Sequence, residues 1–200
     1  MGPAQARVAA VLLLTLRGTP TLYYGDELGL PDVPVARDRV QDPWERRVPG
    51  LGRDPVRTPM PWSDTEPNAG FCPAGVEPWL PLWPGAAASS VAAQERDAGS
   101  ILCLYRRLLA LRRAEDALAL GDWEALRAAD GVFAYVRGGR FLVVLNLTGE
   151  ERGLSLAGRS GEVVLSARGG REGERAAGDL RLAADDALIV RLAPSTSGAA

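Results

Sequence analysis

The chain contains no histidine and no lysine, and only two of its 200 residues are cysteines. Without histidine, Ser-His-Asp and Cys-His catalytic units are excluded. Cys72 and Cys103 are too few for a zinc site built from Cys and His, so no metal is expected. Two cysteines could form one disulfide, but such sparse cysteine usage favours reduced thiols.

Long apolar runs and excess charge are also lacking. The longest apolar run, Val8–Leu16, is far shorter than the ~20 residues that span a bilayer, and no small-residue cleavage pattern follows it. We interpret it as a buried helix in a cytoplasmic protein. All 23 basic residues are arginines, and with 25 acidic residues the net charge is −2, so no nucleic-acid or other polyanionic partner is indicated.

The first half of the chain predicts two helices separated by a long loop. Residues 3–16 lack helix breakers after Pro3, and residues 99–114 place leucines at three- and four-residue spacings. Between them, Thr21–Tyr24 predicts a short strand bounded by Pro20 and Gly25. Residues 25–97 show little periodicity and many prolines, which is typical of a functional loop, and their tryptophans favour order.

From about residue 120 the pattern indicates β-structure. Two β-type runs, residues 132–136 and 141–147, flank Gly138-Gly139, a good hairpin signal. Further strands are expected at residues 162–165 and 187–192, with an exposed loop over residues 168–178. We place a domain boundary near residue 117, with a small antiparallel β domain over 118–193 and a flexible tail over 194–200.

Two motifs stand out in the loop region. Gly18-Thr19-Pro20-Thr21-Leu22-Tyr23-Tyr24-Gly25-Asp26-Glu27-Leu28-Gly29 is followed by Arg57-Thr58-Pro59-Met60-Pro61-Trp62. This pair resembles the α-glucosidases and oligo-1,6-glucosidases of the α-amylase-like glycoside hydrolase family. The resemblance covers nearly the whole chain, because the expected order of helix, strand, loop, helix and β domain matches the C-terminal part of such an enzyme.

The resemblance implies a fold class, an α/β barrel fragment followed by a small antiparallel β-sandwich. Residues 1–117 would form the C-terminal end of the (β/α)8 catalytic barrel. The helix at 3–16 would be the seventh barrel helix, Thr21–Tyr24 the eighth strand and the helix at 99–114 the eighth helix. Residues 118–193 would form the sandwich.

The family also implies retaining hydrolysis of terminal α-linked glucose by three carboxyl groups that precede this segment. The third belongs to an Asn-His-Asp motif, which a chain without histidine cannot contain. Met1 is therefore expected to fall inside the family sequence, and the chain alone is expected to be inactive, with no catalytic residue. Adjacent Asp26 and Glu27 point to different sides of an extended chain, so we expect them to anchor the loop.

Arg57 is the one predicted substrate-binding residue, because the equivalent arginine of similar α-glucosidases contacts the non-reducing-end glucose. A guanidinium suits this role by donating several hydrogen bonds from a fixed plane. The alternative is that Arg57 braces the loop through a carboxylate. Met60 and Trp62 are expected to pack in the loop core, with a sugar platform as the alternative. Phe71 also matches the family and is interpreted as packing, with the rim of the pocket as the alternative. Asp64 is expected to form an Asx-type turn, and Tyr23 and Tyr24 to face opposite sides of their strand.

Alternatives to an α-glucosidase stay open at this point. A trehalose synthase or a glucosyl transferase would differ mainly in how it handles the acceptor. The chain could also be a non-catalytic β-domain partner of a split enzyme, complementing an upstream polypeptide that carries the rest of the barrel, or a non-functional fragment. No cofactor is expected, and the partner in a complete enzyme would be an α-glucoside oligosaccharide.

Overall fold

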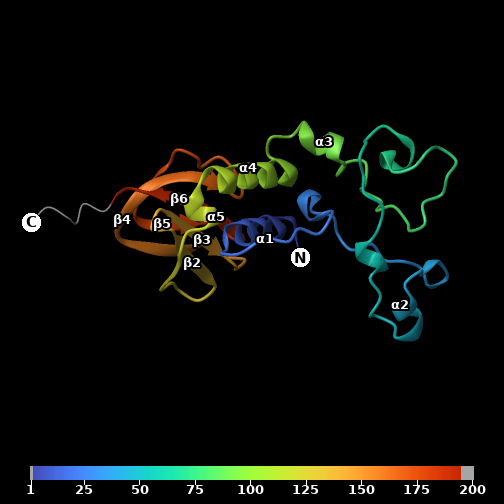
Figure 1. The fold of residues 1–200 in the computed structure, drawn as a ribbon, viewed down its shortest axis with the longest axis horizontal. Coiled ribbons are helices and arrows are strands. Elements are labelled where there is room, and N and C mark those ends of the chain that lie inside the picture. The colour runs from blue at the N-terminus through green and yellow to red at the C-terminus, as the bar shows by residue number, and fades with distance from the viewer. Residues whose placement is uncertain (1, 195–200) are drawn as a thin grey trace, which may run out of the picture. The chain divides into compact units, whose positions relative to one another are not determined.

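The computed structural model describes residues 2–194, and its contacts divide them into two compact units (Figure 1). One unit, the sheet unit, holds residues 2–21 and 104–194. The other, the loop unit, holds residues 22–103. Of the predicted tail only Pro194 lies inside the described residues, and the domain limits at 117 and 193 stay predictions.

The predicted first helix is confirmed as α1, Pro3–Thr15. Pro3 occupies the first turn, where its missing N–H is not needed. The helix buries Val8, Val11 and Leu14 and packs against β3 and β6 of the sheet. The apolar run therefore is a buried helix, and no helix within residues 2–194 is long and apolar enough to cross a membrane.

Two arginines donate hydrogen bonds to the backbone carbonyl groups at and just beyond the end of α1. Arg112, from the second predicted helix, donates to Leu14 O at 2.9 Å and to Gly18 O at 2.6 Å. Arg137 is fully buried and donates to Thr15 O and, at 3.0 Å, to Gly121 O. Guanidinium donors suit a helix C-terminus, whose last carbonyls lack intrahelical partners and carry partial negative charge.

The second predicted helix is confirmed as α4, Ile101–Ala114, and a short helix, α5, follows at Asp116–Ala119. Six antiparallel strands then form one sheet in the order β1-β2-β3-β6-β4-β5. The predicted Gly-Gly hairpin is confirmed: Gly138 and Gly139 both have positive φ between β2 and β3. The strands are β1 Trp123–Leu126, β2 Val132–Arg137, β3 Phe141–Asn146, β4 Arg152–Ser166, β5 Arg175–Leu182 and β6 Asp186–Leu192.

Side chains alternate across the central strands, and both faces are buried. One face of β3 contributes Leu142 and Val144 to an apolar core that also includes residues from β2, β4, β5 and β6. The other face carries Val143 and Leu145, on the side where α1 packs against β3 and β6. The sheet closes over its own core in this way because β4 is long enough to pair with both β5 and β6.

The predicted antiparallel β-structure is confirmed. The strands form a single sheet that curls over its own core, with a bulge in β4 between Ser155 and Ser160, where Ala157 and Gly158 adopt positive φ. The expected loop over 168–178 is wrong at its end, because β5 already begins at Arg175. Pairing with β4 forms that strand despite its polar sequence.

The loop unit is built mainly from turns and short helices, as its prolines predict. Its helical segments are α2 Pro43–Arg47, α3 Val91–Glu95 and four short 3₁₀ turns at Asp26–Leu28, Arg37–Arg39, Asp54–Val56 and Pro67–Gly70. A small apolar cluster of Leu28, Met60 and Leu102 lies within it. Both cysteines are free, as expected.

The strand predicted at Thr21–Tyr24 is wrong. A strand needs a neighbour to complete its hydrogen bonds, and in the described chain this segment pairs with none. It forms a turn instead, in which Asp26 N donates to Tyr23 O at 3.2 Å and Leu30 N to Gly25 O at 3.0 Å. Tyr23 and Tyr24 are consequently both exposed, and their rings lie 5.2 Å apart between centroids.

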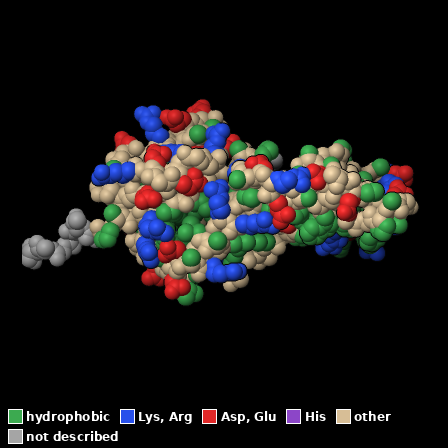
Figure 2. Space-filling model, turned by 90° about the horizontal axis from the view of Figure 1, so that it is seen from above, with side chains coloured by type: hydrophobic (Ala, Val, Ile, Leu, Met, Phe, Trp, Pro, Cys, Tyr) green, Lys and Arg blue, Asp and Glu red, His purple; other side chains and the backbone are tan. Residues whose placement is uncertain are grey.

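Charged side chains of both signs are interspersed on the face that Figure 2 shows, as the small net charge predicts. Many ion pairs between arginine and an acidic side chain lie within residues 2–194, and most of these side chains are exposed. Exposed pairs of this kind contribute little to stability individually.

Candidate functional site

The predicted substrate-binding residue, Arg57, lies beside a buried carboxylate. Its Nη1 is 3.9 Å from Asp42 Oδ2, and its side chain is 39% exposed, whereas that of Asp42 is 1% exposed. The guanidinium is thus held on one side and open to solvent on another. One ion pair at this distance uses only a part of the five N–H donors of an arginine.

Asp42 organises the segment around Arg57. Its Oδ1 accepts from Trp44 N at 2.9 Å, which caps α2, and its Oδ2 accepts from Arg53 N at 3.0 Å. Hydrogen bonds from the backbone N–H groups of Trp44 and Arg53 hold the pKa of Asp42 below its ordinary value. The carboxylate is therefore charged at neutral pH and available to attract Arg57.

A second buried carboxylate fixes the first. Asp54 Oδ2 accepts from Gln41 N at 2.6 Å and from Asp42 N at 2.8 Å. Asp42 Oδ2 in turn accepts a hydrogen bond from the backbone N–H of Arg53, the residue before Asp54. The two aspartates thus bind segments 11 to 13 positions apart in sequence to each other, and they close the loop that presents Arg57.

Tyr24 joins the two motifs of the sequence. Its hydroxyl donates to Thr58 O at 3.1 Å, so the segment after Pro20 contacts the segment that begins at Arg57. Burial and the neighbouring Tyr23 raise the pKa of Tyr24, and the nearby Arg57 opposes that shift. The bond to Thr58, the residue after Arg57, places this hydroxyl at the edge of the candidate site.

Asp26 and Glu27 anchor their turn, as predicted. Asp26 Oδ2 accepts from Tyr23 N at 3.1 Å, and Glu27 Oε2 accepts from Gly25 N at 2.9 Å. Each carboxylate is thus bonded to the backbone of the residues just before it. This arrangement supports the turn and gives no pair of carboxyl groups facing each other across a substrate.

A left-handed turn follows Trp62. Asn68, Ala69 and Gly70 have φ values of 52°, 50° and 72°, a conformation that costs a residue such as Ala69 about 1–2 kcal/mol. Asn68 stabilises it by donating to Pro73 O at 3.1 Å and to Val76 O at 2.8 Å. The carbonyl of Ala69 accepts from both Trp62 N and Ser63 N, at 2.8 and 2.9 Å.

Several packing predictions for this region need correction. Met60 is buried as expected, but Trp62 and Phe71 are 53% and 46% exposed. Asp64 forms an ion pair with Arg96 rather than an Asx turn. The hydroxyl of Ser63 makes the turn instead, accepting from Thr65 N and Glu66 N at 3.2 Å.

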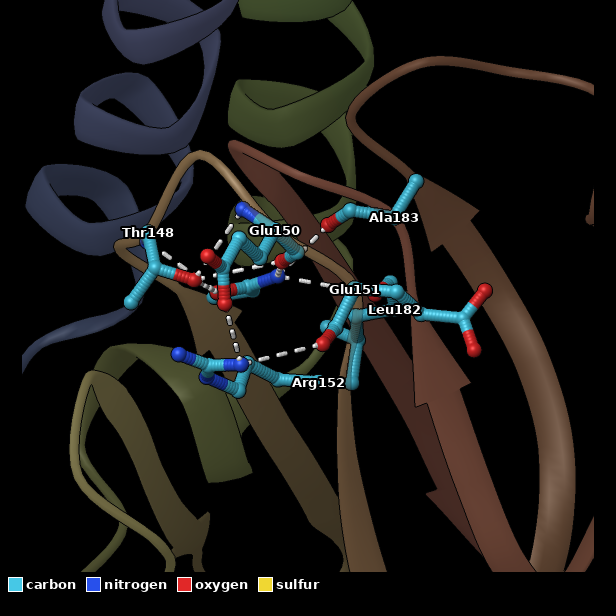
Figure 3. Close-up of polar contacts among 7 residues, drawn as sticks. Thr148, Glu150, Glu151, Arg152, Leu182 and Ala183 are labelled. Atoms are coloured by element: carbon cyan, nitrogen blue, oxygen red, sulfur yellow. Dashed lines mark hydrogen bonds and ion pairs between the residues drawn. The ribbon is translucent and has the colours of Figure 1, made fainter.

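Another polar cluster lies in the sheet unit, at the connection between β3 and β4 (Figure 3). Buried Asn146 donates to Glu150 O and Ala183 O, both at 2.7 Å, and accepts from Thr148 N and Thr148 Oγ1. All of its hydrogen-bonding groups are thus used within the protein. We assign this cluster a structural role, in which one amide side chain joins the β3–β4 turn to the β5–β6 turn.

Metal binding finds no support in the described part of the chain. Among residues 2–194 no group of three or more Cys, Asp or Glu side chains could hold a metal ion. The paired aspartates Asp42 and Asp54 accept hydrogen bonds from backbone N–H groups.

The family model described as "Alpha amylase, catalytic domain" matches residues 2–121. This chain belongs to the α-amylase family. The match ends just before β1, so the six-stranded sheet lies beyond the matched region. The helices α1 and α4, together with the whole loop unit, are thus part of an α-amylase-type catalytic domain.

Curated relatives agree with the family. The chain is 34% identical over 189 residues to a glucan 1,6-α-glucosidase of Streptococcus pneumoniae, covering 84% of this chain and 35% of the relative. It is 40% identical over 136 residues to a probable α-glucosidase of Rhizobium meliloti, covering 67% and 24%. The chain therefore spans about a quarter to a third of the length of these relatives, and it is similar to that part of them.

Solved structures confirm the fold. The α-glucosyl transfer enzyme XgtA is 36% identical, with a TM-score of 0.80 over 95% of this chain and 36% of that protein. A trehalulose synthase, MutB, is 27% identical, with a TM-score of 0.82 over 94% of this chain and 38% of that protein. Nearly the whole chain thus corresponds in fold to rather more than a third of each of these two proteins.

Proposed function

We propose that the chain forms the C-terminal part of a retaining α-glucosidase that acts on the terminal α-linked glucose of oligosaccharides. The observation that supports this most directly is Arg57, which opens the Arg57-Thr58-Pro59-Met60 motif and is half open to solvent beside buried Asp42. The names of the relatives in Streptococcus and Rhizobium agree with this proposal. We further propose a cytoplasmic location.

In this proposal Arg57 binds the substrate and does not react with it. Its guanidinium donates hydrogen bonds to hydroxyl groups of the terminal glucose, and Asp42 fixes its position. Retaining hydrolysis needs two carboxyl groups about 5 Å apart on either side of the scissile bond. Asp26, Glu27 and Asp42 are all bonded to backbone N–H groups, so we assign these carboxylates structural roles. The reacting carboxylates would come from the remainder of such an enzyme.

Hydrolysis of p-nitrophenyl α-glucoside tests the proposal. We expect the 200-residue chain alone to release no nitrophenol, and the same chain joined to the N-terminal segment of the streptococcal relative to release it. In the joined enzyme, Arg57→Ala should lower kcat/KM about 10- to 100-fold, the effect of losing hydrogen bonds from a charged donor. Arg57→Lys, which keeps the charge but not the planar fork, is the matched control and should recover only part of the loss.

Two results would contradict the proposal. Release by the 200-residue chain alone, reduced by Arg57→Ala, would show that a catalytic pair exists within these residues. A joined enzyme that folds and hydrolyses the substrate equally well with and without Arg57 would remove the assigned substrate contact. Circular dichroism of each variant separates loss of activity from loss of folding.

A glucosyl transferase is the second candidate, favoured by the 36% identity to an α-glucosyl transfer enzyme. It would bind the same terminal glucose but pass it to a sugar instead of water. Product analysis of the joined enzyme with maltose distinguishes the two, because a hydrolase yields glucose and a transferase yields longer oligosaccharides. A trehalose synthase would instead convert maltose to trehalose.

A split enzyme is the third candidate, in which the chain complements a separate polypeptide. Mixing the chain with the N-terminal segment of the relative as two molecules tests it. Activity that appears only on mixing would support the split arrangement.

A further inference from the structure

Two arginines lie beside one buried carboxylate oxygen. Asp42 Oδ2 accepts hydrogen bonds from Arg53 N at 3.0 Å and from Arg53 Nε at 3.4 Å. Arg57 Nη1 lies 3.9 Å from the same oxygen, which exceeds hydrogen-bonding distance. Arg57 is therefore attracted to Asp42 by its charge, whereas Arg53 is hydrogen-bonded to it.

The acceptor positions of Asp42 explain this difference between the two arginines. An ionised carboxylate offers about four acceptor positions, two on each oxygen. On Oδ2, the backbone and the side chain of Arg53 occupy both. The backbone N–H groups of Trp44 and Arg53 lower the pKa of Asp42 most, and the Arg53 side chain lowers it further through its hydrogen bond and its charge. The charge of Asp42 is thus coupled to Arg53, and Arg57 is the second of two cations that compete for it.

The turn at Asp54–Val56 fixes the backbone of both arginines. Val56 N donates to Arg53 O at 3.2 Å, and Arg57 N donates to Asp54 O at 3.0 Å. Because the main chain is held at both positions, only the side chain of Arg57 has to rotate to reach the carboxylate. A movement of about 1 Å would bring its guanidinium within hydrogen-bonding distance. The open separation therefore depends on Arg53 occupying the oxygen.

We propose that Arg53 is a positioning residue that keeps Arg57 available for the terminal glucose. Arg53 occupies Asp42 Oδ2, so Arg57 stays beside the carboxylate without giving up N–H donors to it. A close bidentate pair would use two of the five N–H groups of Arg57. This role rests on the proposed function, because it requires that Arg57 binds the sugar.

Arg53→Ala in the 200-residue chain tests the competition directly, since it removes the guanidinium but keeps the backbone N–H that bonds to Asp42. We expect Arg57 to close onto Asp42. Exchange of its guanidinium hydrogens with water, measured by nitrogen-15 NMR, should then slow about 3- to 10-fold, the effect of one added hydrogen bond. If Arg53 only supported the loop, its loss would leave this exchange unchanged or make it faster, and either result would overturn the proposal.

Arg47→Ala is the matched control for the loss of one positive charge. Arg47 is an exposed arginine at the end of α2, and Asp42 takes its hydrogen bonds from Trp44 and Arg53 instead. Exchange at Arg57 should be the same in this variant as in the wild type. An equal slowing in Arg47→Ala would overturn the proposal, because the effect would then come from net charge.

Kinetics of the joined enzyme test the consequence for the sugar. Arg53→Ala should raise the KM for p-nitrophenyl α-glucoside about 3- to 10-fold with kcat unchanged, because the new bond to Asp42 must break each time the sugar binds. Arg53→Lys keeps a cation that can donate to Oδ2, so it should recover most of the loss. A fall in kcat at constant KM, or no recovery with lysine, would overturn the role.

The outcomes separate this proposal from the function on which it rests. If Arg57→Ala leaves KM unchanged, the sugar contact of Arg57 fails. If Arg57→Ala raises KM but Arg53→Ala changes neither KM nor the exchange at Arg57, the sugar contact stands and the positioning role is overturned. The role is also overturned if Arg57 in the wild type exchanges as slowly as Arg112, which is hydrogen-bonded to Leu14 O and Gly18 O.

Discussion

Different kinds of interaction stabilise each of the two units of this chain. In the sheet unit, strand pairing satisfies the backbone, and apolar side chains such as Leu142 and Val144 fill a continuous core. In the loop unit, individual polar side chains satisfy the backbone: Asp42, Asp54 and Asn68 each bond to two or more main-chain groups. A fold made by many equivalent contacts tolerates the loss of one surface contact, whereas a loop held by a few carboxylates depends on each of them.

Deleting a core side chain should have the largest effect, and it should be confined to the sheet unit. Leu142 is fully buried, so Leu142→Ala removes buried methyl groups and leaves a cavity. We expect a loss of about 2–5 kcal/mol in the free energy of unfolding, measured by urea denaturation. Leu147→Ala, at a 53% exposed position, is the control and should cost far less. Equal losses in the two variants would contradict a continuous core.

The next effect concerns the polar contact between α1 and the sheet. Tyr135 is fully buried, and its hydroxyl lies 2.6 Å from Thr15 Oγ1. Burial raises the pKa of Tyr135 to about 12. Because an unfolded tyrosine ionises near pH 10, the folded state binds this proton more tightly. Stability from this group is therefore fully present below about pH 10 and is lost as the pH rises towards 12, by roughly 2–3 kcal/mol.

The Tyr135→Phe variant checks this pH dependence. It removes the ionisable hydroxyl, so its unfolding free energy should be lower by about 1 kcal/mol at pH 8, from the lost hydrogen bond. Between pH 10 and 12 it should fall less steeply than that of the wild type. Parallel curves for the two proteins across that range would show that Tyr135 does not retain its proton.

Replacing Asp54 should change the stability of the whole molecule least. It is nevertheless the most specific test of how the loop unit is stabilised. Asp54→Ala leaves the amides of Gln41 and Asp42 without their acceptor, a local cost of about 1.5–3 kcal/mol for bonds to a charged group. Hydrogen exchange of these two amides should accelerate about 10- to 100-fold, while amides of β3 should not change. Asp54→Asn keeps one acceptor oxygen and should show a smaller increase. Faster exchange throughout β3 would show that the two units depend on each other.

The sheet unit could largely be predicted from the sequence. The absence of helix breakers after Pro3 identified α1, helical spacing identified α4, and Gly138-Gly139 between two apolar runs identified the β2–β3 hairpin. The first half of β4 and most of β5 escaped prediction, because their glycines, serines and arginines form strands only through pairing with each other. The curl of the sheet likewise depends on long-range pairing of β4 with two neighbours.

The candidate site could be predicted only in part. Arg57 was identified through its motif, but its neighbours Asp42 and Asp54 were not, because each acts on backbone groups up to 13 residues away. One signal was present in the sequence: Asp42 precedes Pro43, the pattern of a helix N-cap followed by proline in the first turn. The exposure of Trp62 and Phe71 had no such signal in the sequence.

The anchoring of α1 has a consequence for the time at which the protein can fold. This helix is made near the start of the segment, yet it packs against β6, at residues 186–192. At the usual 5–20 residues per second of synthesis, the helix waits roughly 10 to 30 s for that strand. During this interval Val8, Val11 and Leu14 have no sheet to cover them, so we expect the nascent chain to depend on chaperones more than the small size of the sheet unit would suggest.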